Sequence, residues 1–259
     1  MSSKVPAQRI RQPRVAELVA SRLRDDILTG RLKEGDVLPS QESLFAEFGV
    51  SPPAVREAIH ILEADGLISV RRGNVGGAVV HLPSAERTAQ MISMVLQTRA
   101  ATPGDVSEAL LHLEPICAGM CASREDRATE VVPHLQAAID AQVEQFDSPS
   151  QYVPNARRFH EAIVSHCGNE PMILLIGSLQ VIWSAHESSV WSDEYHPSDP
   201  MEPKTMRAAL RDHQRLLDAI AEGNSARAVK LAGDHLAAAR RNTLAAASQK
   251  TIEAKLISN

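Results

Sequence analysis

Residues 37–82, VLPSQESLFAEFGVSPPAVREAIHILEADGLISVRRGNVGGAVVHL, decide the fold. Ser40 can cap the start of a first helix. Gly49 ends that helix, because glycine readily adopts the left-handed conformation that follows helices. Between them, apolar side chains recur at helical spacing, at Leu44, Phe45 and Phe48. This half of the stretch therefore predicts one short amphipathic helix and a tight turn.

A second helix and a hairpin follow the turn. Ser51 is another cap, and a proline in the first helical turn is tolerated because the amide proton it lacks has no intrahelical partner there. The apolar face of this helix is Val55, Ile59 and Leu62, and the helix stops at Asp65-Gly66. Residues 67–70 and 78–80 are short strand candidates, joined by a tip rich in glycine and asparagine, as a hairpin turn requires.

The order helix, turn, helix, glycine-rich hairpin is that of a winged helix-turn-helix. The second helix can enter a DNA major groove, where Arg56 can read guanine through two hydrogen bonds. Arg71 and Arg72 can meet phosphates or the minor groove. Each arginine alone could be a solvated charge, so the prediction depends on the whole arrangement. The predicted DNA contacts are Arg14, Ser40, Ser51, Pro52, Arg56, His60, Arg71, Arg72, Gly73, Asn74 and Gly76.

Outside this stretch the sequence predicts helices almost throughout. A polar arm, residues 1–13, precedes a helix that ends before Gly30. After Pro83 the predicted helices are 84–99, 103–123, 127–146, 152–167, 171–189, 203–222 and 224–247, with a proline-containing loop at 190–203. We expect a mostly α protein with two domains: a winged helix-turn-helix over 1–83, with three helices and a β-hairpin wing, and an all-α antiparallel helical bundle over 84–259.

Charge and composition agree with this division. The first 83 residues hold 11 basic and 10 acidic side chains, and the remainder hold 16 and 22, so the net charge of −5 belongs to the second part. The three cysteines lack a paired framework, which is typical of a reducing compartment. No apolar run reaches the ~20 residues of a membrane span, and no signal peptide is evident. We expect a cytoplasmic protein with no membrane partner.

Residues 14–82 resemble the GntR family of bacterial regulators. The resemblance implies a homodimer on a pseudo-palindromic site in double-stranded DNA. Two positions depart from the family pattern, Pro52 where arginine is usual and Glu42 where a basic residue is frequent. Recognition should therefore depend more on Arg56 and the wing. The stretches that carry the resemblance are 27–35, 37–44, 48–51, 55–59 and 62–68.

The second part is similar to the FadR-like branch of that family, whose helical FCD domain binds an effector and often a metal. The resemblance is carried by Leu113-Glu114-Pro115, Arg158-Phe159-His160, Gly168-Asn169, Asp212-His213 and Asp234-His235-Leu236. It implies three metal ligands, His160, His213 and His235. Three neutral imidazoles from separate helices can converge in a bundle and bind zinc, nickel or a similar divalent ion.

One expected ligand is missing from this pattern. The family usually has an aspartate one turn before the first histidine, and here that position is Ala156. The neighbouring Asn155 points about 100° away around the helix, so it is a poor substitute. The site would be neutral, which lowers affinity for a divalent ion. The alternative is that the three histidines line a polar effector pocket without metal.

These features together predict a transcription regulator, a repressor, controlled by a small organic acid or similar metabolite, and not an enzyme. His112, Trp183 and His186 are further candidates to face the effector pocket. A rival interpretation is a metal-dependent hydrolase that uses the three histidines. Against it, no glutamate or aspartate stands in a known catalytic spacing such as His-Glu-x-x-His.

Overall fold

The computed structural model describes residues 14–71, 77–147, 149–194, 203–247 and 251–257. The chain divides into two compact units, residues 1–83 and 84–259. Each unit has its own hydrophobic core. Among the described residues, no helix combines the length and hydropathy that crossing a membrane would require.

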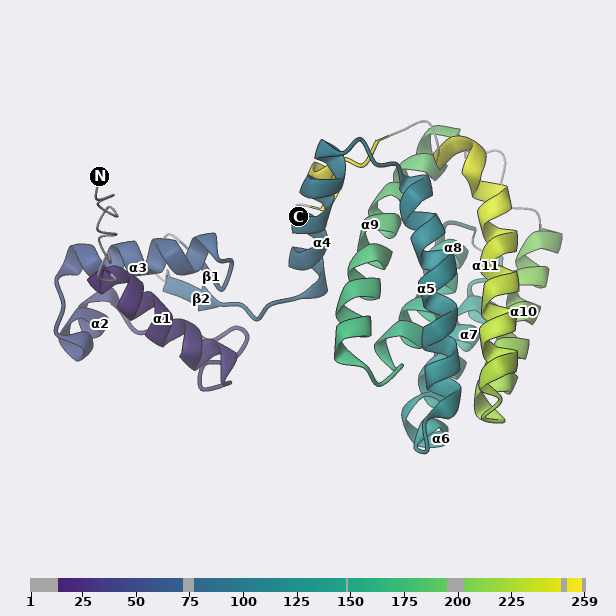
Figure 1. The fold of residues 1–259 in the computed structure, drawn as a ribbon, viewed down its shortest axis with the longest axis horizontal. Coiled ribbons are helices and arrows are strands. Elements are labelled where there is room, and N and C mark those ends of the chain that lie inside the picture. Colours follow the sequence, from purple (N-terminus) through teal and green to yellow (C-terminus); the bar gives the residue numbers. More distant parts are fainter. Residues whose placement is uncertain (1–13, 72–76, 148, 195–202, 248–250, 258–259) are drawn as a thin grey trace, which may run out of the picture. The chain divides into compact units, whose positions relative to one another are not determined.

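The first unit is a small helical cluster with one hairpin (Figure 1). Its elements are α1 (Val15–Leu28), α2 (Gln41–Phe48), α3 (Pro52–Ala64), β1 (Ile68–Arg71) and β2 (Gly77–Val80). The strands are antiparallel, with Ile68 opposite Val80 and Arg71 opposite Gly77. Fully buried apolar side chains from α1, α2, α3 and β1 meet in the core: Ile27, Leu44, Leu62 and Ile68. Three helices and a hairpin are therefore arranged as a winged helix-turn-helix requires.

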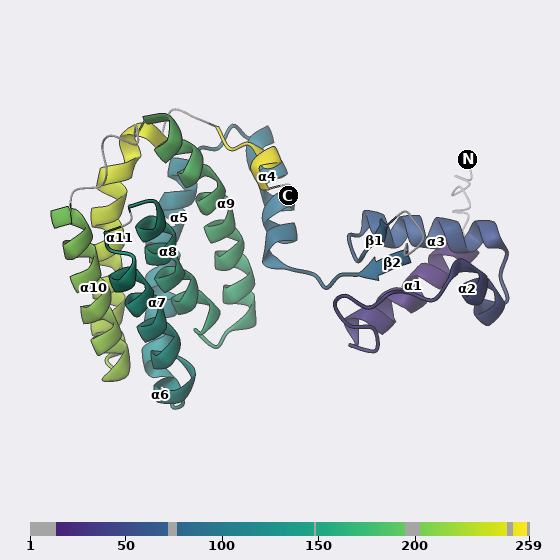
Figure 2. The same cartoon turned by 180° about the vertical axis from the view of Figure 1, so that it is seen from behind.

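The second unit is a bundle around α5 (Figures 1 and 2). Its elements are α4 (Ala85–Thr98), α5 (Pro103–Ser123), α6 (Arg127–Glu130), α7 (Val132–Glu144), α8 (Pro149–Ser165), α9 (Glu170–Glu194), α10 (Pro203–Ala221), α11 (Ser225–Ala247) and the 3₁₀ turn η1 (Ala254–Ile257). Helix α5 packs against α8, α9, α10 and α11, whereas α4 packs on α9 and on η1. The approach of α11 to α5 is close, because a Cβ at Gly119 would lie 2.6 Å from the Val229 side chain.

Three of the predicted helix boundaries were wrong. The single helix expected over 127–146 is two helices, broken at Val131. Pro133 explains the break, because proline lacks the amide proton of an interior helical position and its ring clashes with the carbonyl four residues earlier. Helix α9 continues to Glu194, into the stretch expected to be a loop, and α8 begins at Pro149 rather than at residue 152.

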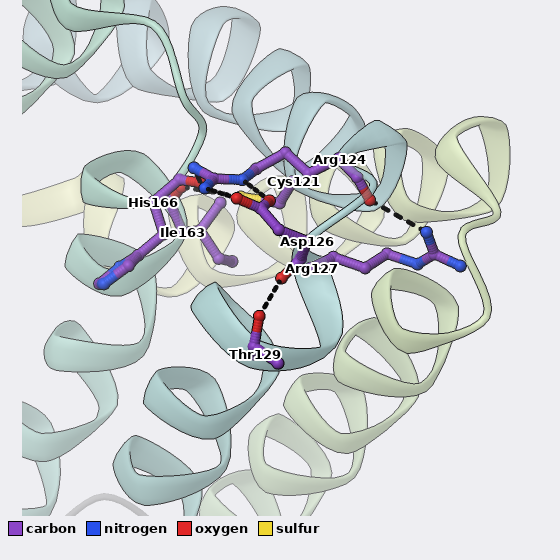
Figure 3. Close-up of polar contacts among 7 residues, drawn as sticks. All are labelled: Cys121, Arg124, Asp126, Arg127, Thr129, Ile163 and His166. Carbon is purple, nitrogen blue, oxygen red and sulfur yellow. Dashed lines mark hydrogen bonds and ion pairs between the residues drawn. The ribbon is translucent and has the colours of Figure 1, made fainter.

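The corner between α5 and α6 ties three helices together (Figure 3). The Arg124 guanidinium donates to the His166 carbonyl at the end of α8 (3.0 Å) and pairs with Asp126. Arg127 in turn donates to the Arg124 carbonyl (3.0 Å). A cation beside the last carbonyls of α8 is favoured by the helix dipole. The corner therefore stabilises one end of the bundle.

The three cysteines lie inside the bundle and are free thiols. The Cys121 thiol donates to the Ile163 carbonyl (Sγ–O 3.2 Å, Figure 3). Burial raises the pKa of Cys121 to about 12 and also raises that of Cys117. Thiols held protonated in this way are poor nucleophiles, so these residues act as small core side chains.

Candidate DNA-binding surface and metal centre

Helix α3 presents one exposed face and one buried face. Pro52, Arg56 and His60 are exposed and spaced by four residues, so they lie on one side of the helix. The opposite side packs into the core through Val55, Ile59 and Leu62. The exposed side thus has the shape and chemistry of a recognition helix.

The other predicted DNA contacts lie around α3 and the hairpin. Ser51 precedes α3 and is exposed, whereas the Ser40 hydroxyl caps α2 by accepting from the Ser43 amide (3.1 Å). Arg14 precedes α1 and lies 3.5 Å from Glu57 of α3. Arg71 is exposed at the end of β1. Arg72, Gly73, Asn74 and Gly76 lie outside the described residues.

Three histidines from three helices meet inside the second unit. His160 comes from α8, His213 from α10 and His235 from α11. The Nε2 atom of His213 is 3.3 Å from Nε2 of His160 and 3.1 Å from Nε2 of His235. Each residue offers one nitrogen, and these nitrogens all lie within 4.8 Å of one another. Phe159 stacks on the His213 ring with centroids 4.4 Å apart, which fixes the plane of that ring.

The Nδ1 atoms of these histidines face acceptor groups. His160 Nδ1 donates to the buried carboxylate of Glu114, and His213 Nδ1 donates to Gln142 Oε1 (2.8 Å). The Gln142 amide donates to the Ala138 carbonyl, which turns its oxygen toward His213. Asp212 Oδ2 lies 3.7 Å from His235 Nδ1. Partners of this kind fix the tautomer in which Nε2 carries a lone pair, as in many histidine-metal sites.

The environment disfavours the charged forms of His213 and His235. Burial, followed by the charges of His160 and His235, holds the pKa of His213 well below its usual value. Burial and the neighbouring His160 lower the pKa of His235 to about 3. Neutral imidazole is the form that binds a metal, because the proton and the cation compete for the same lone pair.

The donor set fits a divalent transition metal. Two nitrogens that each lie about 2.0–2.1 Å from a tetrahedral zinc are themselves about 3.3 Å apart. The two Nε2 separations at His213, 3.3 Å and 3.1 Å, are close to this value. In the metal-binding tautomer, with the proton on Nδ1, His160 and His213 would each turn an Nε2 lone pair toward the other ring. A cation between them would relieve that repulsion.

A cavity of about 290 Å³ opens beside the three histidines. Its walls come from α5, α8, α9, α10 and α11 and are mostly small and apolar, with Trp183 as the largest side chain. Two arginines, Arg157 and Arg240, are the cationic side chains of its lining. The apolar and small residues of the lining are Leu110, Val153, Ala156, Ala208, Ala209, Leu236, Ala238 and Ala239. The cavity has the size and character of a site for one small metabolite.

Both units of the chain match models of known protein families. Residues 15–79 match the model described as bacterial regulatory proteins, gntR family. Residues 105–238, more than half of the chain, match the FCD domain. This chain belongs to the FadR-like branch of the GntR family.

Similar proteins carry regulator names. The GntR-family chain is 28% identical over 239 residues to the HTH-type transcriptional regulator Mce2R of Mycobacterium tuberculosis, covering 89% of this chain and 92% of that one. It is 25% identical over 227 residues to the HTH-type transcriptional repressor NanR of Salmonella newport, covering 86% and 83%. A solved structure, Streptococcus agalactiae GntR, shares the fold, with a TM-score of 0.66 at 21% identity over 88% of this chain and 99% of that one.

The GntR-family chain is therefore a DNA-binding transcription regulator with a metabolite-binding effector domain, and it is not an enzyme. The predicted winged helix-turn-helix and all-helical second part are confirmed. The hydrolase alternative is not supported, because the family and its named relatives are transcription regulators.

Of the three residues predicted to face the effector pocket, Trp183 lines the cavity, whereas His112 and His186 are not part of its lining. Trp183 lines the cavity, as does Ala156, which stands where the family usually has aspartate. His112 is exposed on α5 and is not part of the lining. His186 is 2% exposed but bonds to the Ile182 carbonyl and the Glu253 amide instead of lining the cavity. Asn155 also faces elsewhere, toward the Ala141 carbonyl.

Several residues that line the cavity or hold the histidine rings were not singled out from the sequence. Glu114 belongs to the Leu113-Glu114-Pro115 motif, but nothing in that motif predicts its hydrogen bond with His160. Gln142 and Gln180 carry no local signal, since their partners are 71 and 66 residues away in sequence. Arg157 could have been found from its spacing, because it lies one turn before His160 on α8.

Proposed function

We propose that residues 84–259 bind a small organic acid through a divalent metal ion, zinc or nickel, held by His160, His213 and His235. The observation that carries the proposal is the convergence of the three Nε2 atoms at the wall of a small cavity. The family resemblance supports the same assignment. We further propose that residues 1–83 bind the operator and that the effector controls this binding.

Each residue of the site has a separate part in this proposal. His160, His213 and His235 would hold the ion, while Glu114 and Gln142 orient two of the imidazoles. A bound ion would supply Lewis acidity, which attracts a carboxylate ligand. Arg157 and Arg240 favour an anion in the cavity, and Trp183 contacts its apolar part. Ala156 leaves room for a ligand group where an aspartate side chain would otherwise lie.

The DNA contacts we propose are those predicted from sequence, with Arg56 as the base-reading residue. Pro52 and His60 flank it on α3, and Ser51 precedes that helix. Arg14 and Ser40 lie at neighbouring helix starts, and Arg71 ends the first strand of the wing. The chain would bind as a homodimer, because one recognition helix reads only a few base pairs and paired half-sites supply the specificity.

Helix α4 supplies a candidate dimer contact. Met91, Met94 and Val95 are exposed by 62%, 43% and 51%, and their spacing of three and four residues places them on one face. A row of exposed apolar side chains on one helix is typical of a surface that another chain covers. The named repressor among the relatives makes repression the direction that we propose.

The metal assignment can be tested directly. Purified protein would be stripped of metal, titrated with zinc and analysed for bound metal, in parallel with His213→Ala. We expect one zinc per chain in the original protein and none in the variant. If metal-free protein refolded with excess zinc retains none, the three histidines line a metal-free pocket.

The regulatory assignment needs a second experiment. A gel shift with the DNA that flanks the protein's own gene, with and without pools of organic acids, should show binding that one pool releases. The salt concentration must be held constant, because phosphate contacts weaken steeply as salt rises. Failure to bind any flanking DNA at low salt would contradict the proposal.

A further inference from the structure

The C-terminal segment, residues 251–257, is a packed element of the second unit. It consists of an extended stretch followed by η1 and lies against α4 and α9 (Figure 1). Ile252 is 0% exposed and belongs to the core of the bundle. Ile257 packs against the same core. A chain end that buries side chains in this way is held in place by the rest of the fold.

Three consecutive backbone amides of this segment bond to three different parts of the unit. The Ile252 amide donates to the Ala101 carbonyl in the α4–α5 connection (2.9 Å). The Glu253 amide donates to Nε2 of His186 on α9 (2.9 Å). The Ala254 amide donates to Oε1 of Gln97 on α4 (3.0 Å). The segment therefore joins α4, its following turn and α9.

His186 is built to receive this segment. It is 2% exposed, and its Nδ1 lies 2.8 Å from the Ile182 carbonyl, so Nδ1 donates there. In that tautomer Nε2 is an acceptor, and the Glu253 amide supplies the matching donor. If the segment left, Nε2 would lose a partner at a buried position, which is costly unless water enters.

Helix α9 leads from His186 back to the cavity. Gln180, Trp183 and His186 follow one another at three-residue spacing, so each neighbours the next, while Gln180 and His186 lie about 120° apart around the helix. Gln180 donates to Glu114 (3.1 Å) and to the His160 carbonyl (3.2 Å), beside the histidine cluster. Trp183 is in the cavity wall. Two turns of one helix thus contact the ligand site at one end and the C-terminal segment at the other.

We infer that residues 251–257 form a strap that locks α4 onto α9, and that occupation of the cavity tightens this strap through Gln180, Trp183 and His186. The strap follows from the contacts alone. Its response to a ligand rests on the proposed effector site.

The position of α4 makes this strap relevant to regulation. Helix α4 is the first element after residue 83, so it carries the covalent connection to the DNA-binding unit. Its packing partners among the described elements are α9 and η1. A strap that is either docked or released gives α4 two states, and a ligand that orders α9 favours the docked one.

The first experiment tests the strap in metal-free, full-length protein by hydrogen exchange and mass spectrometry. Truncation after Lys250 or Ile252→Asp should speed exchange of the α4 amides about tenfold or more, with α5 little changed. Lys255→Ala is the matched control, because that side chain is 78% exposed and its ion pair is with Glu253 of the same segment. Unchanged α4 exchange in the truncated chain would overturn the inference.

The second experiment tests the coupling with zinc as the probe. Zinc should slow exchange in residues 251–257 and in α4 of the original chain and of Lys255→Ala, but not of His213→Ala. In Ile252→Asp the slowing of α4 should be lost, and zinc should bind more weakly by about the factor by which it slows exchange of residues 251–257 in the original chain, because the coupling is reciprocal. Equal slowing of α4 in Ile252→Asp, or a zinc affinity identical to that of the original chain, would contradict the coupling.

If the original chain binds no zinc, the proposed metal site fails and the strap is judged without it. Trp183→Ala then replaces zinc, because it removes the largest side chain of the cavity wall on α9. Faster exchange of residues 251–257 in this variant supports the coupling. Unchanged exchange there overturns it, whatever the metal experiment gives.

Discussion

The two candidate sites of this regulator are built in opposite ways. The proposed DNA-reading face is a row of exposed side chains on α3, and its residues stand only eight positions apart from Pro52 to His60. The proposed metal site is assembled inward from three helices, with His160 and His235 separated by 75 positions and the rings of His160 and His213 held by the buried side chains of Glu114 and Gln142. The first can lose a side chain without disturbing the core. The second cannot.

The strongest expected effect is the loss of metal from His213→Ala. Removing one of three ligands should lower zinc affinity by more than the ~10–100-fold that loss of a supporting residue costs. Zinc at 100 times its dissociation constant should stabilise the original protein by about 2.7 kcal/mol, and the variant by nearly nothing. Zinc titration and thermal unfolding measure both effects. His112→Ala, an exposed histidine of the same unit, is the control, and equal zinc affinity in both variants would exclude His213 as a ligand.

A smaller loss should follow from Gln142→Ala. This residue holds the His213 ring through Nδ1 and would not touch the ion, so zinc affinity should fall about 10–100-fold with stoichiometry unchanged. Gln136→Ala on the same helix, whose amide bonds to the exposed Asp140, should leave zinc affinity unaltered. If the two glutamine variants bind zinc alike, the orienting bond has no role in the site.

The exposed site should behave differently when altered. Arg56→Ala is expected to cost about 1–3 kcal/mol of specific DNA binding, with the free energy of unfolding unchanged within about 0.5 kcal/mol. Operator affinity tests the loss of DNA binding, and urea unfolding tests the unchanged stability. Arg22→Ala, an exposed arginine on α1, is the matched control. Full operator affinity in Arg56→Ala would remove Arg56 from the interface.

A fall in pH should lower the stability of the protein through the buried histidines of the second unit. The folded pKa values of His213 and His235 lie below the unfolded value of about 6.5. Their contribution to stability is therefore present above that pH and is lost as pH falls toward the folded values. Metal-free protein should lose stability between about pH 7 and about pH 5, and the loss should be smaller in His213→Phe. Identical pH profiles for the two proteins would contradict this origin.

The smallest effect concerns the turn that receives the strap. Ala100 has φ of 52°, a left-handed conformation that alanine adopts only with strain. Ala100→Gly should relieve that strain at some cost in unfolded-state entropy, for a net gain of at most about 1 kcal/mol. Thermal unfolding measures it, and a clear destabilisation would show that the Cβ is needed for packing.

The contrast between the sites also explains what the sequence could predict. Helix caps such as Ser40, the turn at Gly49 and the apolar spacing of α3 are local signals, so the first unit followed from neighbouring residues. The three histidines followed from a family resemblance and then proved to lie together in space. The contacts of Gln142, Gln180 and Ile252 are made with partners more than 60 positions away in sequence. Neither helical spacing nor secondary-structure propensity encodes such contacts. The helix break at Val131 could have been predicted locally, because Pro133 follows it in the sequence.

The alanines of the cavity wall have a consequence for how this regulator could change over evolutionary time. At Ala208, Ala209, Ala238 and Ala239, a single larger residue would subtract one or more methylene volumes from the cavity while leaving the three histidines unsubstituted. Each methylene buried against a ligand is worth about 0.8 kcal/mol, so such replacements retune the preference for ligand length in small steps. The residues proposed to hold the ion and the cavity wall proposed to select the metabolite are thus different side chains, so ligand preference could change without altering the proposed metal site.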